Sequence, residues 1–328
     1  TSVVALLVCY CLGALVWYGY HRVAVMLGIA TTVLLYAKTE LRGIASRLTA
    51  ADYSSMLQFG VLSLIILPVL PDRDYGPYNA FNPHQIWLMV VLIAGMSLAG
   101  YAALRLVGPR SGAPLIGLFG GLVSSTATTL VFARDARRDP GMTTTATVVI
   151  LLANVIMMIR VAGIVGVLAP ALLTEIASTL VAGLVPAAAV AGYGWRQLRR
   201  TDSLPMPQVR NPTELRAALG FGAMYAAVLF LSAWLSDIAG DSGIYGVALV
   251  SGLTDVDAIT LSSLRLYAMT QLNGDTAVIA IGLAVVANVF FKFGLSAAIA
   301  GRGLARGVLP AMVTAAIGIG ASLIWQFG

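Results

Sequence analysis

Long apolar runs separated by short polar connectors dominate this chain of 328 residues. A helix needs about 20 mostly apolar residues to cross a bilayer. Eleven runs of about that length lie near residues 2–19, 22–37, 54–70, 84–107, 114–133, 142–168, 170–194, 213–236, 243–266, 275–299 and 305–327. The sequence therefore predicts an all-α polytopic membrane protein, with residues 1–328 forming a single helical membrane domain in contact with the lipid bilayer.

The composition excludes several classes of protein. Hydrophobic residues make up 59% of the chain and charged residues only 10%, whereas a soluble domain carries about 25% charged residues. A soluble enzyme and a nucleic-acid-binding domain are therefore excluded, although the pI is about 9.5. Cys9 and Cys11 lie two residues apart in one apolar run, which excludes a disulfide framework. The sequence contains no Ser/His/Asp, Cys/His or HExxH set, so we expect neither an enzyme nor a cofactor.

The positive charges predict the topology, because cytoplasmic connectors carry an excess of Lys and Arg. If all eleven runs cross the membrane and the connector 38–52 is cytoplasmic, the cytoplasmic connectors hold 7 Lys and Arg and the external ones hold 11. The opposite orientation gives 11 against 7, which is only a weak bias. If the run 114–133 enters and leaves on the same side, the cytoplasmic connectors hold 14 Lys and Arg and the external ones hold 4. We therefore expect about ten transmembrane helices plus one re-entrant or broken segment, with both ends of the chain in the cytoplasm.

An internal repeat surrounds this re-entrant segment. Residues 121–130 and 252–261 match at five of ten positions. Flanking matches follow in the same order, 57–60 with 219–222 and 153–155 with 287–289. We expect one repeat over about 38–194 and a second over about 195–328, after a leading helix pair at 1–37. In the predicted topology the copies run in the same direction, and transporters place their site where such repeats meet.

Polar residues in the second copy of the motif have two interpretations. Thr254 and Asp257 have the spacing of a capping box, in which Asp255 and Asp257 neutralise a helix start and Lys292 is a possible counter-ion. Alternatively, Asp255 and Asp257 are metal ligands, because an ionisable residue at membrane depth marks a functional site by default. Carboxylate, hydroxyl and amide oxygens suit a hard cation such as Mg²⁺, or a proton or Na⁺, better than a soft metal.

The first copy offers hydroxyl groups where the second offers carboxylates. We expect Ser124, Ser125 and Thr126, together with Thr254 of the second copy, to complete the shell of an ion bound closer to the two aspartates. Asn154 and Asn288 lie at matching repeat positions near the middle of long spans, so both are further candidate ligands. Arg160 and Lys292 lie about two turns from span ends and are expected to snorkel toward the interface as structural residues.

Four segments carry a resemblance to a known family. They are Leu70-Pro-Asp-Arg-Asp-Tyr-Gly-Pro77, Asn82-Pro-His-Gln-Ile-Trp-Leu-Met89, Gly120-Gly-Leu-Val-Ser-Ser-Thr-Ala-Thr-Thr129 and Ser251-Gly-Leu-Thr-Asp-Val-Asp-Ala258. From about residue 40 to its end the chain resembles the DUF4010 membrane domain of MgtC/SapB-type bacterial proteins. The resemblance implies a multi-pass protein of the bacterial inner membrane, linked by name to magnesium, and supplies no catalytic residues. In that family an MgtC-like segment usually precedes the domain, and the abrupt start at Thr1 suggests that such a segment is missing.

These observations lead to two functional expectations of different classes. The first is a transporter or channel for a divalent metal cation, with Mg²⁺ as the first candidate and a transition metal as the second. The alternative is a non-transporting regulator that acts through partner membrane proteins. A transporter needs the polar centre, whereas a regulator tolerates its loss. The substrate, the direction of transport and the oligomeric state stay open, a homodimer included.

Overall fold

A computed structural model describes residues 2–38, 49–107, 112–197 and 215–328. Its elements are α1 (Ser2–Trp17), α2 (His21–Tyr36), α4 (Ala50–Gly60), η1 (Val61–Ile66), α5 (Leu67–Val69), η2 (Pro77–Asn79), α6 (Pro83–Val107), α7 (Gly112–Arg138), η3 (Pro140–Met142), α8 (Thr143–Leu168), η4 (Pro170–Leu172), α9 (Leu173–Gln197), α10 (Leu215–Ala239), α11 (Asp241–Thr254), α12 (Val256–Ala268), α13 (Gly274–Ala300) and α14 (Arg302–Phe327). The described residues form helices and no strand longer than an isolated bridge, which confirms the all-α class.

The helices have the length and composition of a polytopic membrane protein. Within the described ranges, eight helices are long and apolar enough to cross a membrane, and α1 and α2 are shorter apolar helices. The chain divides into two compact units, Thr1–Ser54 and Ser55–Gly328. The first contains the α1–α2 pair, and the second contains every element from the end of α4 onward. The predicted repeat bounds at 38, 194 and 195 stay a prediction.

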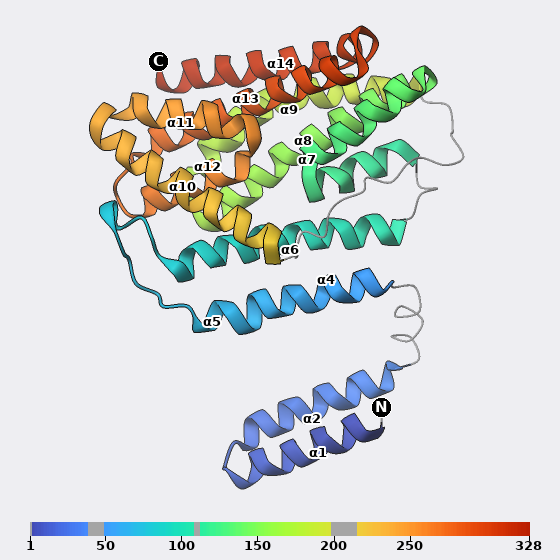
Figure 1. Ribbon diagram of the computed structural model, residues 1–328, viewed down its shortest axis with the longest axis vertical. Coiled ribbons are helices and arrows are strands. Elements are labelled where there is room, and N and C mark those ends of the chain that lie inside the picture. Colours follow the sequence, from blue (N-terminus) through green and yellow to red (C-terminus); the bar gives the residue numbers. More distant parts are fainter. Residues whose placement is uncertain (1, 39–48, 108–111, 198–214) are drawn as a thin grey trace. The chain divides into compact units, whose positions relative to one another are not determined.

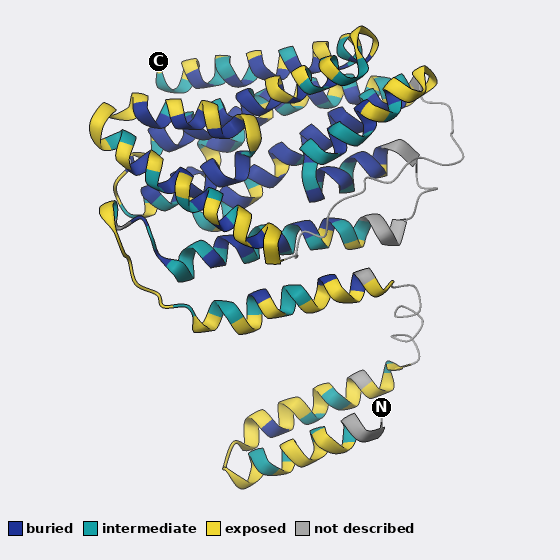
Figure 2. Ribbon diagram, in the orientation of Figure 1, coloured by how far each residue is buried: buried dark blue, intermediate teal, exposed yellow. Residues whose placement is uncertain are grey.

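Helices α8 and α13 form the centre of the larger unit. In the most apolar 18-residue stretch of each span, 72% of the residues are buried in the span containing α8 and 56% in the span containing α13, against 33% in the spans containing α9 and α14. Figure 2 shows this as dark ribbon in the middle of the bundle. Polar residues carried by these two helices are therefore held away from lipid.

Helix α7 turns back on itself. Ser124, in its middle, has extended backbone angles (φ −168°, ψ 108°). Before this break the chain runs alongside α8 in the same direction, with Gly117 against Val149 and Gly121 against Ala153. After the break it returns, since Arg138 is followed within five residues by the start of α8 (Figure 1). The structure thus confirms the predicted re-entrant segment.

Helices α11 and α12 form a second hairpin. The break falls at Asp255 (φ −153°, ψ 127°). The tip of α11 lies deep in the bundle, where Gly252 packs against Ala284 of α13, and the chain then returns through α12 to the start of α13. The prediction of a full crossing at 243–266 was wrong. The two helices have 14 and 13 residues, about 20 Å each, and a bilayer core is about 30 Å thick.

The two hairpins enter the bundle from opposite ends. Helices α8 and α13 are antiparallel, because Gly274 at the start of α13 lies against Leu172, just after α8, and Gly307 early in α14 lies against Thr147, early in α8. Each hairpin has its base beside the start of the helix that follows it. The predicted parallel arrangement of the copies was therefore wrong, and the arrangement is inverted (Figure 1).

The inverted arrangement also places the C-terminus at a different end of the bundle from the predicted one. The amide of Gln326 donates to the Thr179 hydroxyl near the start of α9, at 3.1 Å. The C-terminus therefore lies at the opposite end of the bundle from the basic segment that precedes α8, and the two cannot share one side of the membrane. The expectation of a cytoplasmic C-terminus beside a cytoplasmic Arg134–Arg138 segment was wrong, because it counted the second hairpin as a crossing.

A polar strap lies at the end of the bundle at which the second hairpin enters. It consists of Asp72, Asp74, Asn82 and Arg265. The side-chain amide of Asn82 donates to Asp72 at 2.9 Å and to Asp74 at 3.0 Å, and Arg265 at the end of α12 pairs with Asp74 at 3.2 Å. The hydrogen bond from Asn82 lowers the pKa of Asp72. The strap thus ties the start of α6 to the base of the second hairpin.

The inverted hairpins predict opposite accessibility for their two bases. With Cys9 and Cys11 replaced by serine, we expect Asn273→Cys to react with an impermeant maleimide added outside intact cells. Arg137→Cys should react only after permeabilisation, because arginines gather at that end of the bundle. Both positions are exposed on the protein surface. Reaction of both residues from the same side would contradict the inverted arrangement.

Candidate functional site

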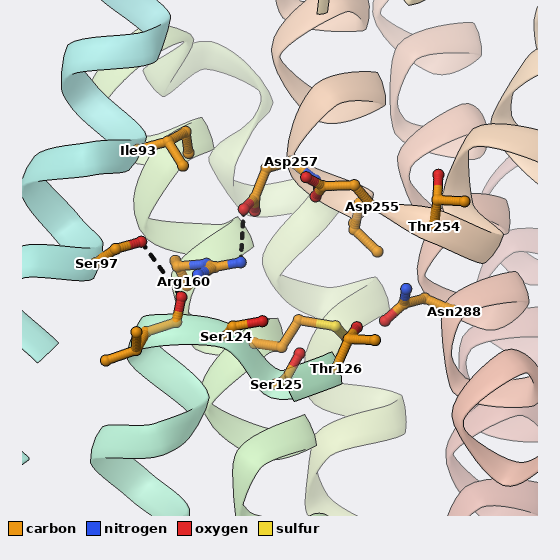
Figure 3. Close-up of a pocket in the computed structure, with 13 residues that line it drawn as sticks. Ile93, Ser97, Ser124, Ser125, Thr126, Arg160, Thr254, Asp255, Asp257 and Asn288 are labelled. Carbon is orange, nitrogen blue, oxygen red and sulfur yellow. Dashed lines mark hydrogen bonds and ion pairs between the residues drawn. The ribbon is translucent and has the colours of Figure 1, made fainter. Parts of the chain in front are cut away.

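The two hairpin tips meet at a polar cavity of about 150 Å³. Figure 3 shows the break of α7 on one side and the break between α11 and α12 on the other. Helices α6, α8 and α13 supply the remaining walls. The lining residues are Ile93, Ser97, Val123, Ser124, Ser125, Thr126, Met157, Arg160, Thr254, Asp255, Val256, Asp257 and Asn288. The structure thus brings seven of the eight predicted ion-binding residues to one cavity, Asn154 being the exception.

Each break is capped by the residue at which it occurs. The Ser124 hydroxyl accepts the backbone N–H of Ala127 at 3.2 Å, and the Asp255 carboxylate accepts that of Asp257 at 2.7 Å. Serine and aspartate are favoured N-cap residues. The predicted capping box was wrong in detail, because the Thr254 hydroxyl donates to the Ser251 carbonyl in the preceding helix at 3.0 Å.

A buried ion pair crosses the cavity. The Arg160 Nη2 lies 2.6 Å from the Asp257 Oδ2, and the two residues are only 9% and 3% exposed. The Arg160 Nη1 donates to the Leu122 carbonyl, just before the break of α7, at 3.0 Å. A single guanidinium therefore connects α8 to the tips of both hairpins.

This pairing engages only one of the two carboxylate oxygens of Asp257. Among the described residues, none forms a hydrogen bond with the buried Oδ1 of Asp257. A buried carboxylate oxygen without a donor is costly. Asp257 lines the cavity, and a cation or a donor group that reaches its Oδ1 would satisfy this oxygen.

Lys292 is buried on the other side of the α7 break. Its ammonium group is fully inaccessible to solvent. It donates to the Ser125 hydroxyl at 2.7 Å, to the Asn154 Oδ1 at 3.0 Å and to the Met157 sulfur at 3.1 Å. The prediction that Lys292 and Arg160 snorkel to the interface was therefore wrong. Asn154 positions Lys292 and does not line the cavity.

The side chains of Arg160 and Lys292 each bind the hairpin tip of the other repeat. Arg160 follows the first hairpin and binds the tip of the second, whereas Lys292 follows the second hairpin and binds the tip of the first. With Asp255 and Asp257, the two cations form a set of four titratable side chains whose formal charges sum to zero. The structure gives Arg160 the counter-ion position for which the sequence suggested Lys292.

Asn288 supports the second hairpin as Lys292 supports the first. Its side-chain amide donates to the Gly252 carbonyl at 2.8 Å, near the end of α11. In Figure 3 the amide of Asn288 borders the cavity beside Thr254. Asn288 and Asn154 therefore differ in role, although both were predicted as ligands from matching repeat positions.

Comparison with known proteins places the chain in a family. Residues 91–300 match the model described as "Domain of unknown function (DUF4010)". The chain belongs to the DUF4010 family. An uncharacterized protein of Aquifex aeolicus (strain VF5) is 30% identical over 182 residues, which cover 55% of this chain and 79% of the relative. No solved structure matches the chain significantly.

The DUF4010 match includes both hairpins together with α8 and α13. It therefore covers every residue of the cavity and the whole inverted arrangement. Sequence reasoning missed Arg160 and Ser97 as cavity residues. The signal for Arg160 was present, because an arginine inside a long apolar span rarely lies there without a partner.

Two glycines let the hairpin tips approach the central helices. A Cβ at Gly121 would lie 2.7 Å from the Cα of Ala153, and one at Gly252 would lie 2.5 Å from the carbonyl oxygen of Ala284. We expect Gly121→Ala and Gly252→Ala each to lower the free energy of unfolding by about 1–3 kcal/mol through overpacking.

Gly163 provides the matched control, because a Cβ there has no neighbour within 4 Å. Gly163→Ala should be neutral or stabilise the protein, since alanine favours a helix over glycine by about 1 kcal/mol. Thermal unfolding in detergent measures all three variants. Equal melting temperatures for the three would show that close packing does not hold the tips in place.

Proposed function

We propose that this DUF4010 protein is a membrane transporter that carries a small divalent metal cation through the cavity between its hairpin tips. The observation that carries the proposal is the buried Asp257 carboxylate, with one oxygen free, at the meeting point of two oppositely inserted broken helices. Mg²⁺ is the first candidate substrate and a transition metal is the second.

The arrangement of the helices supports transport. Many secondary transporters consist of inverted repeats, and they bind their substrates near the middle of the bilayer at discontinuous helices. Here each repeat supplies one hairpin, and the tips border the same cavity. Such a cavity opens to one side or the other when one repeat moves relative to its partner, which is the basis of alternating access.

The side chains around the cavity support a hard cation. Asp255, Asp257, Ser124, Thr126 and Asn288 offer oxygen atoms, which Mg²⁺ prefers. The soft sulfur atom of Met157 already accepts a hydrogen bond from Lys292, which makes a transition metal the weaker candidate.

The size and charge of the cavity favour an ion that keeps part of its water. Within the described ranges, no three His, Cys, Asp or Glu side chains gather closely enough to hold a metal on their own. A cavity of about 150 Å³ has room for several water molecules. Mg²⁺ usually keeps several waters and binds through one or two carboxylates, which matches this site.

The proposal includes the membrane in which the protein lies and its orientation there. The resemblance to MgtC/SapB-type proteins and the bacterial relative support a location in the inner membrane of a bacterium. The arginines near the base of α7 and near the start of α14 support a cytoplasmic position for that end of the bundle.

The proposal predicts that flux depends on the charge of Asp257. In liposomes containing purified protein, we expect uptake of Mg²⁺ that Asp257→Asn lowers at least tenfold. The change keeps the shape of the side chain and removes the charge that binds the ion. Asp255→Asn should have a smaller effect, because asparagine is itself a good N-cap.

Asp237→Asn is the matched control, since Asp237 accepts a hydrogen bond from Tyr78 at 3.0 Å and does not line the cavity. Its flux should equal that of the unaltered protein. Mn²⁺ and Zn²⁺ in parallel assays test the second substrate class. Unaltered flux in Asp257→Asn, or no flux of any cation with folded protein, would contradict the proposal and favour a non-transporting membrane regulator.

A further inference from the structure

We infer that Arg160 is an internal counter-ion that neutralises the empty site and so allows the unloaded transporter to reorient. The inference rests on the proposed cation transport and deepens it. It assigns to Arg160 a role that binding alone does not require, because an ion site made of oxygen atoms needs no guanidinium beside it.

The geometry places Arg160 where a transported cation would compete with it. The guanidinium lies 2.6 Å from one oxygen of Asp257, and the second oxygen of that carboxylate has no hydrogen-bond partner within the described part of the chain. A cation that enters the cavity therefore meets a carboxylate that already holds one positive charge. Repulsion between the two positive charges drives the guanidinium away from Asp257 as the cation binds.

Arg160 has a second partner that holds it nearby when it is displaced. Its other terminal nitrogen donates to the Leu122 carbonyl at 3.0 Å, on the opposite hairpin. The guanidinium can therefore loosen its contact with Asp257 without leaving the cavity. When the cation departs, the arginine is still close enough to pair with the carboxylate again.

Lys292 does not fill this role. Its ammonium group is already bound by Ser125, Asn154 and Met157, and it forms no ion pair with either carboxylate. Its three partners are neutral groups, the Ser125 hydroxyl on α7 and the side chains of Asn154 and Met157 on α8. Arg160 is thus the cation in direct contact with the carboxylate at which the substrate binds.

The energetics explain why an empty site needs such a partner. Removing one partner of a buried ion pair is strongly destabilising, because the remaining charge is left uncompensated. With Arg160 present, Asp257 is neutralised both when the site is loaded and when it is empty. Both forms can then reorient, and the transporter performs net uptake.

Without the arginine, only the loaded form keeps the carboxylate neutralised. The protein would then bring a cation in and return with another cation bound. Exchange of cations across the membrane would continue, and net uptake would stop. The ratio of net uptake to exchange is therefore the quantity that reports on Arg160.

The experiment compares the two modes in the same liposomes. Net uptake of Mg²⁺ is measured into Mg²⁺-free liposomes, and exchange is measured with isotopically labelled Mg²⁺ at equal concentrations on both sides. For Arg160→Gln we expect the ratio of net uptake to exchange to fall at least tenfold. Arg160→Lys keeps the charge and should retain a ratio closer to that of the unaltered protein.

Arg265→Gln is the matched control. Arg265 also pairs with an aspartate, Asp74 at 3.2 Å, but at the end of α12 and outside the cavity. Its ratio should not change. Because both modes are measured on one preparation, the ratio does not depend on how much of a variant is folded.

The outcomes distinguish the counter-ion role of Arg160 from the proposed transport itself. An unchanged ratio in Arg160→Gln would overturn the counter-ion role and leave the proposed transport intact. Loss of both modes together in folded Arg160→Gln and Arg160→Lys would also overturn it, because exchange does not need an empty return. Absence of both modes in the unaltered protein would instead overturn the proposed function.

Discussion

A helix that ends inside a bilayer must satisfy the backbone groups that it frees, and the rest of this structure depends on how that is done. The last carbonyls of a helix and the first N–H groups of the next have no partner within the helix, and lipid offers none. At the two breaks, Ser124 and Asp255 cap the restarted helices. Arg160 and Asn288, reaching in from α8 and α13, donate to carbonyls of the helices that stop.

This solution places charged groups in the middle of the molecule. The arginine that satisfies a carbonyl of the first hairpin needs an anion, and Asp257 of the second hairpin supplies it. The aspartate has a second oxygen, which this pairing leaves free. The groups that stabilise the two breaks therefore also line a polar cavity and leave one carboxylate oxygen unpaired, and the proposed function rests on that carboxylate.

Part of this arrangement could be predicted from the sequence. The apolar runs give the class of protein, and the basic residues on both sides of 114–133 indicate the first re-entrant segment. The repeat aligns Ser124 with Asp255, and the two breaks occur at these residues. The second hairpin was missed because 243–266 is long and apolar enough for a crossing and has no basic residues on both flanks.

The remaining errors have two physical causes. The direction of the second repeat depended on whether 243–266 crosses, so one wrong crossing inverted the relation between the copies. The partners of Arg160 and Lys292 lie on helices 97 and 167 residues away in the sequence. Long side chains reach in either direction along a helix, so hydropathy alone does not distinguish a side chain that reaches the interface from one that crosses to another repeat.

The proposed transport requires that the cavity between the hairpin tips opens to both sides of the membrane and holds the transported cation. Accessibility of Thr126→Cys, which lines the cavity, tests it most directly in a chain with Cys9 and Cys11 replaced by serine. We predict reaction with an impermeant maleimide in both right-side-out and inverted vesicles, slowed in both by saturating Mg²⁺. Reaction from one side only, at a rate that no divalent cation changes, would contradict the account.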